Sequence, residues 1–405
     1  MAKTAVPNPV SMMRHNASAV PRRLRGMLSL DDFEGPARRH LPLSVFGYVS
    51  GGVEDDVTLS ENRAAFRRIG LRPRVLRDVS RRDLTTQLFG QEYALPFGIA
   101  PMGFSALAAF DGDVVLAKGA RATGTFAICS AASLTPLERV AADGGSRWFQ
   151  SYIPGDRDRI AALLERVRRA GFDTLVVTAD VPVAGNRENN ARNGFDAPLK
   201  MTPQLAWQGL THPRWVLGTL AREIAARGMP HFENMESVQG PPLFSRDLVR
   251  SKIARDELGW DHIRFIRDIW PGKLVVKGIL DVADARLAAD AGCDGVIVSN
   301  HGGRQLDGVV SPLAVLPEIR AALPETVVMF DSGVRRGTDV LKAIMLGADF
   351  VFVGRPFLYA AAVHGAPGVV HAANLLRDEI DRDMALLGIT TPLAARDHSP
   401  VPLPG

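Results

Sequence analysis

Residues 295–307 read Gly295-Val296-Ile297-Val298-Ser299-Asn300-His301-Gly302-Gly303-Arg304-Gln305-Leu306-Asp307, and this stretch decides the fold. Its first five residues form an apolar run without polar alternation, which is typical of a strand buried on both faces of a parallel sheet. A polar segment with two glycines follows the run directly. In proteins with parallel sheets, the residues just after the carboxyl ends of the strands are the ones that carry function.

The same unit recurs along the chain. From about residue 94 onward, short apolar runs alternate with longer stretches of helical period, as expected for a parallel sheet covered by helices. Eight such strands close naturally into a barrel, whereas an open doubly wound sheet would carry an early Gly-rich dinucleotide turn, which is missing here. The sequence therefore predicts an α/β fold of the (β/α)8 or TIM barrel type. The eight runs are Pro96–Ala100, Thr125–Cys129, Arg147–Ser151, Thr174–Thr178, Lys273–Lys277, Gly295–Ser299, Thr326–Asp331 and Phe350–Gly354.

Several segments lie outside this repeat. Roughly ninety residues separate the fourth run from the fifth, far more than one connecting helix needs, so we expect a lid or insertion at 195–255, after strand 4. An N-terminal helical segment is expected before the barrel. The predicted organisation is a flexible basic tail at 1–30, a single barrel domain at 31–390, and a Pro-rich tail at 391–405.

Composition and charge exclude several classes of function. The chain has 48 basic and 44 acidic residues, and the basic ones are scattered, so no nucleic-acid partner is expected. No apolar stretch reaches the length of a membrane span, and no signal peptide is visible, which favours a cytoplasmic location. Cys129 and Cys293 lack the spacing of a zinc or redox motif, so we expect buried, reduced thiols and no metal site.

The polar half of the opening stretch carries candidate chemistry. His301 has the side chain best suited to proton transfer near neutral pH, and Arg304 offers a planar fork for a carboxylate. The two glycines beside them let a ligand approach the backbone closely. A lone histidine is more often structural, but this one follows a barrel strand, where catalytic residues gather. We therefore predict that His301 is a general base.

Two further turns indicate a phosphate site. The seventh apolar run is followed by Asp331-Ser332-Gly333-Val334-Arg335, and the eighth by Gly354-Arg355. Backbone amides and guanidinium groups in such turns bind anions, and barrels often place a phosphate at the loops after strands seven and eight.

Taken together, residues 299–307 and Asp331-Ser332-Gly333 resemble the signatures of the FMN-dependent L-2-hydroxy acid dehydrogenases and oxidases, a family that includes glycolate oxidase, lactate dehydrogenase and mandelate dehydrogenase. The resemblance covers about residues 30 to 390. It implies the cofactor FMN, oxidation of a lactate- or mandelate-like 2-hydroxy acid to the 2-keto acid, and a homotetramer.

The resemblance also implies individual roles. Tyr48 and Tyr152 would contact the substrate carboxylate and the reacting hydroxyl, Arg187 would join Arg304 at the substrate, and Asp180 would pair with His301. The residues implied at the flavin are Ala100, Gly103, Ser130, Gln150, Thr178, Lys277, Ser299, Asp331, Gly333, Arg335, Gly354 and Arg355. Among these, Lys277 would lie near flavin N1, where a cation suits the reduced, anionic ring. Substrate size stays open, because Asn186 and residues 189–193 depart from the pattern of several members.

The electron acceptor and the partners are less tightly constrained. Oxidases of the family carry Ala where this chain has Gly103, and residues 212–215 look like those of the dehydrogenase branch, so a quinone or cytochrome acceptor is favoured over oxygen. Segment 201–250, with Trp207, Trp215 and two short amphipathic patterns, fits three roles equally: an active-site lid, a partner surface, or peripheral contact with the inner face of the cell membrane. An oxygen-using oxidase that makes hydrogen peroxide, another FMN barrel enzyme and a non-catalytic flavin protein remain alternatives.

Overall fold

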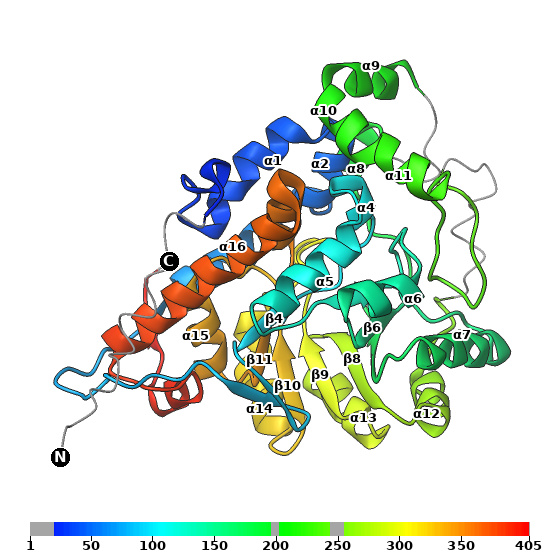
Figure 1. Ribbon diagram of the computed structural model, residues 1–405. Helices are drawn as coiled ribbons and strands as arrows, with labels where there is room; N and C mark the ends of the chain where they lie inside the picture. Colours follow the sequence, from blue (N-terminus) through cyan, green and yellow to red (C-terminus); the bar gives the residue numbers. More distant parts are fainter. Residues whose placement is uncertain (1–19, 196–201, 244–254, 405) are drawn as a thin grey trace, which may run out of the picture.

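The computed structural model describes residues 20–195, 202–243 and 255–404 (Figure 1). Eight parallel strands form one sheet in the order β4-β11-β10-β9-β8-β7-β6-β5. A parallel bridge between Ile99 and Ala127 joins the two edges, so the sheet closes into the predicted (β/α)8 barrel. The strands are β4 (Phe97–Ile99), β5 (Ile128–Ser130), β6 (Trp148–Ser151), β7 (Thr174–Thr178), β8 (Lys273–Ile279), β9 (Gly295–Val298), β10 (Val327–Phe330) and β11 (Phe350–Val353).

The strands coincide closely with the predicted apolar runs, and the largest difference is at the second run. It was expected to begin at Thr125, but the strand begins at Ile128. Thr125 and Phe126 instead approach β4, where the Thr125 hydroxyl donates to Phe97 O and Ile99 N donates to Phe126 O. These residues close the barrel without continuing a regular strand.

Helices cover the outside of the barrel between successive strands. Helix α16 is bent at His364 and Gly365, where the backbone is not helical. The helices after the barrel strands are α4 (Ser105–Ala108), α5 (Gly112–Ala122), α6 (Leu137–Arg139) continued by η4 (Val140–Gly144), α7 (Arg157–Arg169), α12 (Trp260–Ile269), α13 (Val282–Asp290), α14 (Pro312–Ala322), α15 (Gly337–Met345) and α16 (Arg355–Leu387).

The barrel interior is filled with large side chains and plugged at its base. The inward-facing residues form one buried cluster, which a two-stranded hairpin of β2 (Thr86–Leu88) and β3 (Gln91–Tyr93) covers with Leu88, Phe89 and Tyr93. The opposite end, where the strands reach their carboxyl ends, holds a cavity. The cluster includes Ala100, Phe126, Ile128, Trp148, Val176, Val275, Ile297, Met329, Phe350 and Phe352.

The N-terminal segment lies over this open end. It contains η2 (Arg22–Leu24), η3 (Leu30–Phe33), α1 (Glu34–His40), α2 (Leu43–Ser50) and α3 (Val57–Arg67), followed by β1 (Ile69–Gly70). Asp307 binds the first amides of α3, namely those of Asp55, Val57 and Thr58, and so ties the segment to the loop after β9.

Parts of both expected tails are packed. Residues 1–19 lie outside the described part of the chain, but Leu24 is fully buried. The C-terminal segment forms η7 (Leu393–Asp397) and β12 (Val401–Pro402), which pairs with β1. Proline removes a backbone donor but is tolerated in a short edge strand, which explains why the prolines of this segment do not keep it loose.

Helix α8 (Glu188–Asn193) precedes the predicted insertion at 195–255. The insertion contains α9 (Pro203–Thr211), α10 (Pro213–Trp215), η5 (Val216–Leu220) and α11 (Ala221–Arg227), which Figure 1 shows in green above the barrel. Residues 196–201 and 244–254 of the insertion lie outside the described residues. Trp215, expected on an exposed face, is buried instead, because its indole N–H donates to Leu107 O at 2.7 Å.

Two further sequence predictions concern the cysteines and membrane spans. Cys129 and Cys293 are free, buried thiols, as predicted. Within the described ranges, no helix is long and apolar enough to cross a membrane.

Candidate active site

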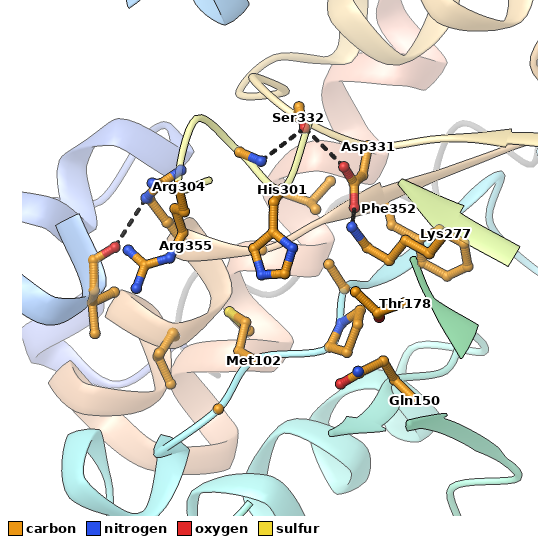
Figure 2. A pocket seen from close by; sticks show the side chains of 18 of the residues that line it. Met102, Gln150, Thr178, Lys277, His301, Arg304, Asp331, Ser332, Phe352 and Arg355 are labelled. Atoms are coloured by element: carbon orange, nitrogen blue, oxygen red, sulfur yellow. Dashed lines mark hydrogen bonds and ion pairs between the residues drawn. The ribbon is translucent and has the colours of Figure 1, made fainter. Parts of the chain in front are cut away.

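A cavity of about 980 Å³, including its open mouth, lies at the carboxyl ends of the strands. Figure 2 shows His301 directed into it, with Arg304 and Arg355 on one side and Lys277 and Asp331 on the other. Most of the predicted site residues meet here although they are far apart in the sequence. Those that line the cavity are Tyr48, Ala100, Gly103, Gln150, Tyr152, Thr178, Arg187, Lys277, His301, Arg304, Asp331, Gly333, Arg335, Gly354 and Arg355.

The backbone after β9 turns sharply to present His301. His301, Gly302 and Gly303 are left-handed in succession, with φ values of 58°, 68° and 74°. The two glycines adopt this conformation without steric cost, whereas a non-glycine residue there stores strain of about 1–3 kcal/mol. The turn is held because Ser299 Oγ accepts from His301 N and Gly303 N donates to Asn300 O. The strained residue is therefore the one with the predicted catalytic side chain.

His301 and Asp180 form a buried pair. His301 Nδ1 lies 2.9 Å from Asp180 Oδ1, and both side chains are largely buried. Burial lowers the pKa of His301 below its usual 6.5, although Asp180 acts in the opposite direction. Burial tends to raise the pKa of Asp180, but the interactions with His301 and Lys277 prevail and lower it. Near neutral pH the imidazole is thus free to accept a proton, and the carboxylate stays ionised beside it.

Two tyrosines line the same cavity as His301. The Tyr152 hydroxyl lies 3.5 Å from His301 Nε2, and burial raises the pKa of Tyr152 well above 10, so it stays a phenol. The Tyr48 ring packs against Phe104 and Phe195, with ring centroids 5.0 and 4.6 Å away. These contacts fix the ring, so that its hydroxyl end reaches the cavity.

Two guanidinium groups lie opposite the imidazole, each anchored on one side. Arg304 donates to Gly51 O at 2.7 Å, and its guanidinium lies 4.9 Å above the Tyr48 ring. Arg187 donates from Nε to Arg304 O at 3.0 Å and from a terminal nitrogen to Gln305 Oε1 at 2.5 Å. Burial, with help from Arg187, lowers the pKa of Arg304 to about 9, so it remains a cation near neutral pH. The remaining N–H groups can bind a carboxylate.

The two predicted phosphate turns both line the cavity. Gly333 has φ +89°, and a Cβ there would lie 2.2 Å from Asn62 O, so only glycine fits. Arg355 is buried against Val49 O and Gly51 O, and burial lowers the pKa values of Arg355 and Arg335, the latter to about 10. Both remain cationic near neutral pH. Two buried cations and a glycine turn form a site for one doubly charged anion.

On the other side of the cavity from Arg304 and Arg355 lie polar side chains, which include Lys277 and Asp331. Lys277 forms a buried ion pair with Asp331 at 2.8 Å and donates to Ser299 Oγ at 2.6 Å. Gln150 accepts from Ser130 through its carbonyl, which leaves its buried Nε2 without a protein partner among the described residues. A buried amide without a partner is costly, so a ligand with an acceptor at this position would stabilise the site.

Three predicted site residues do not line the cavity but contact residues that do. Ser130 binds Gln150, Ser299 binds Lys277 and the His301 amide, and Asp180 binds His301. Other lining residues were not predicted. Ser332, which accepts from Gly302 N, could have been found from its place in the Asp331-Ser332-Gly333 turn, but Met102, Ala132 and Phe352 carry no polar signal.

Comparisons with known proteins agree with this arrangement. The family described as FMN-dependent dehydrogenase matches residues 37–399. The chain is 41% identical over 362 residues to an L-lactate dehydrogenase of Ectopseudomonas mendocina, covering 88% of this chain and 94% of the relative. It is also 40% identical over 367 residues to an L-lactate oxidase of Nostoc sp., covering 89% of this chain and 94% of the relative.

Solved structures with the same architecture include the monotopic membrane protein (S)-mandelate dehydrogenase. It superposes with a TM-score of 0.85 at 35% identity, over 91% of this chain and 98% of the other. A mandelate oxidase superposes with a TM-score of 0.76 at 35% identity, over 93% and 98% of the two chains.

Proposed function

The chain belongs to the FMN-dependent dehydrogenase family and is an FMN-dependent 2-hydroxy acid oxidoreductase. We propose that its substrate is a lactate- or mandelate-like L-2-hydroxy acid. We also propose that the electrons pass to a quinone or cytochrome-type acceptor. One observation carries the site assignment. A neutral imidazole with its own carboxylate faces two anchored guanidinium groups across one cavity. That combination binds a carboxylate and accepts a proton from its neighbouring carbon or hydroxyl.

The residues at the cavity fit FMN. The turns with Gly333, Arg335, Gly354 and Arg355 would hold its single phosphate, and Asp331 would bind the ribityl chain. The unpartnered Gln150 Nε2 would find its acceptor on the polar edge of the ring, beside Thr178 and Lys277. When bound, FMN supplies the two-electron acceptor for substrate oxidation.

The protein residues orient the substrate and move its proton. Arg187 and Arg304 bind the carboxylate through charge-assisted hydrogen bonds, with Tyr48 beside them, and this positioning lowers the entropic part of the barrier. Tyr152 lies at the reacting hydroxyl, within reach of His301 Nε2. His301 accepts the proton, and Asp180 stabilises the imidazolium that results. General base catalysis of this kind contributes about 10² to 10⁴ in rate.

The acceptor proposal rests on the space beside Gly103. A Cβ at this position would lie 2.7 Å from the Ala132 Cβ and 3.2 Å from the Tyr48 hydroxyl. An alanine at this position therefore requires Ala132 and the Tyr48 side chain to move away from it. Absence of this Cβ favours a dehydrogenase over an oxygen-using oxidase.

Peripheral membrane contact is supported by two helices whose apolar residues face outward. On α9, Trp207 and Leu210 are 64% and 72% exposed, while Gln208 is buried and binds Ser44 N and Asn193 O. On the continuous helix 213–227, Leu217 is 69% exposed while Thr219 and Glu223 are buried. A water-soluble surface helix shows the opposite polarity. With exposed Arg214 and Arg222 alongside, this face suits the interface of an anionic bilayer.

Vesicle binding tests the membrane proposal. We expect the protein to sediment with phosphatidylcholine vesicles that contain phosphatidylglycerol, and the double variant Leu217→Glu, Ile224→Glu to lose about tenfold or more in binding, since each buried apolar side chain contributes about 1.5–3 kcal/mol. Leu386→Glu on α16 is the control, because Leu386 is 67% exposed but lies outside the insertion. Equal binding by both variants would refute the assignment of this face.

Flavin reduction tests the enzymatic proposal. We expect released cofactor to be FMN, and an anaerobic screen of lactate, glycolate, mandelate and longer 2-hydroxy acids to bleach it. Arg304→Met should weaken binding of the reactive acid by about 2–5 kcal/mol, the cost of a charge left without its partner. Absence of bleaching by every acid in the screen would refute the proposal. Reoxidation by a quinone analogue should outpace reoxidation by air, whereas peroxide production that matches turnover would identify an oxidase.

A further inference from the structure

We propose that Gln305 is a positioning residue for this oxidation, because its side-chain carbonyl holds the guanidinium of Arg187 in the orientation that binds the substrate carboxylate. The inference rests on the proposed function, since it concerns the same substrate site. Gln305 is not among the residues that line the cavity, so its effect on the substrate passes through Arg187.

The orientation of the Gln305 amide is fixed by three hydrogen bonds. Its Nε2 donates to Asp180 O at 3.2 Å and to Val183 O at 3.1 Å. Backbone carbonyls can only accept, so the nitrogen end of the amide must face them and the oxygen end must face Arg187. Arg187 donates to that oxygen at 2.5 Å. Gln305 thus has no alternative amide orientation that keeps all three bonds.

The loop after β7 and the loop after β9 are in close backbone contact beside Gln305. A Cβ at Gly185 would lie 2.7 Å from the carbonyl oxygens of both Arg304 and Gln305, so the loop after β7 packs directly on the loop after β9. Arg187 Nε donates to Arg304 O in the same place. Both acceptors that hold Arg187 therefore belong to the loop that also presents His301.

This arrangement couples the two halves of the site. Arg187 comes from the loop after β7, and without Gln305 one of its two anchors would be lost while the other, Arg304 O, would still allow the guanidinium to rotate. Its remaining N–H groups would then no longer point consistently at the carboxylate. Loss of this hydrogen bond should therefore raise the dissociation constant of the substrate, while the protein still folds and binds FMN.

A double-mutant cycle separates this role from a general structural one. Flavin reduction by L-lactate and by (S)-mandelate is followed under anaerobic conditions in wild type, Gln305→Met, Arg187→Met and the double variant. We expect Gln305→Met to raise the dissociation constant of the reactive acid by about tenfold or more, the size of one hydrogen bond to a charged group, with FMN content unchanged. In the Arg187→Met background, Gln305→Met should change the dissociation constant less than twofold, because the guanidinium that Gln305 holds is already absent. Leu306→Ala, an exposed neighbour in the same loop, is the control and should match wild type.

Two outcomes would overturn the inference: a wild-type dissociation constant in Gln305→Met, or an equal factor in both backgrounds. If Gln305→Met does not retain FMN, Gln305→Leu takes its place under the same criterion. Its side chain has no acceptor for the Arg187 guanidinium, so substrate binding should again weaken only when Arg187 is present. If no hydroxy acid reduces the flavin of the wild-type protein, the proposed function itself is refuted. The wild-type measurement therefore distinguishes this outcome from failure of the inference about Gln305.

Discussion

Replacement of Asp180 by Asn should slow flavin reduction at saturating substrate by about a hundredfold. Asp180 Oδ1 lies 2.9 Å from His301 Nδ1, and the pair is mostly shielded from solvent. At this distance, a carboxylate and a full imidazolium attract each other by about 6 kcal/mol with an effective dielectric constant of ~20. Since the proton is only partly transferred in the transition state, about half of this attraction, ~3 kcal/mol, is lost there, which corresponds to about two orders of magnitude in rate.

The pH dependence gives the same prediction a second, independent readout. Burial lowers the pKa of His301, and Asp180 opposes that shift. Without the carboxylate the effect of burial is unopposed, so the inflection in the reduction rate should move to lower pH while the plateau falls. Stopped-flow measurements of flavin absorbance between pH 5 and 9 record both quantities. Asp284→Asn, an acid on α13 that makes no contact with His301, is the control. A rate within threefold of wild type, or an inflection that moves upward, would refute the reasoning.

Three further substitutions test other parts of the site. His301→Gln should retain FMN but reduce it about a thousandfold more slowly, as stopped-flow absorbance would record, and a wild-type rate would exclude His301 as the base. Lys277→Met leaves Asp331 buried without its partner, so we expect the free energy of unfolding to fall by about 3–5 kcal/mol. The melting temperature and the FMN content should both decrease, and an unchanged melting temperature would mean that the ion pair does not stabilise the fold. Gly103→Ala should change the ratio of reoxidation by air to reoxidation by a quinone analogue, because its Cβ meets Ala132 and Tyr48, whereas Gly26→Ala, with no atom within 4 Å of the new Cβ, should leave that ratio unchanged.

The barrel and much of the site could be predicted because their signals are local. Each strand buried on both faces is a short apolar run, and the residue that follows it must lie at the same rim as its counterparts. Gln150, Thr178, Lys277 and Asp331 all stand at or beside the ends of the predicted apolar runs, and all four line the cavity. The strand that starts at Ile128 was predicted to begin too early because Thr125 and Phe126 have high β propensity, yet they close the barrel without continuing the strand.

Other features depend on contacts between distant parts of the chain and leave no periodic trace. Pairing of β12 with β1 joins residues 401–402 to residues 69–70, and the prolines around it suggested a loose end instead. Trp215 was considered as a membrane anchor from its place in the insertion. In the structure it is buried in the core, and its indole N–H donates to Leu107 O. Gln305 lies within the motif at residues 299–307, but the sequence does not indicate that its side chain binds Arg187.

The C-terminal end of α2 shows how the fold and the site depend on one another. The last carbonyls of a helix have no partner within it and attract cations, and here they are bound by guanidinium groups of the site. Arg355 donates to Val49 O and Gly51 O, and Arg304 donates to Gly51 O, although these residues are about 250 to 300 positions apart in the chain. Tyr48 lies on the same turn of α2 and lines the cavity. The N-terminal helix therefore orients a substrate arginine and a phosphate arginine with its backbone while it supplies a tyrosine with its side chain. The barrel strands alone do not complete the site, and the docking of α2 is the step that does.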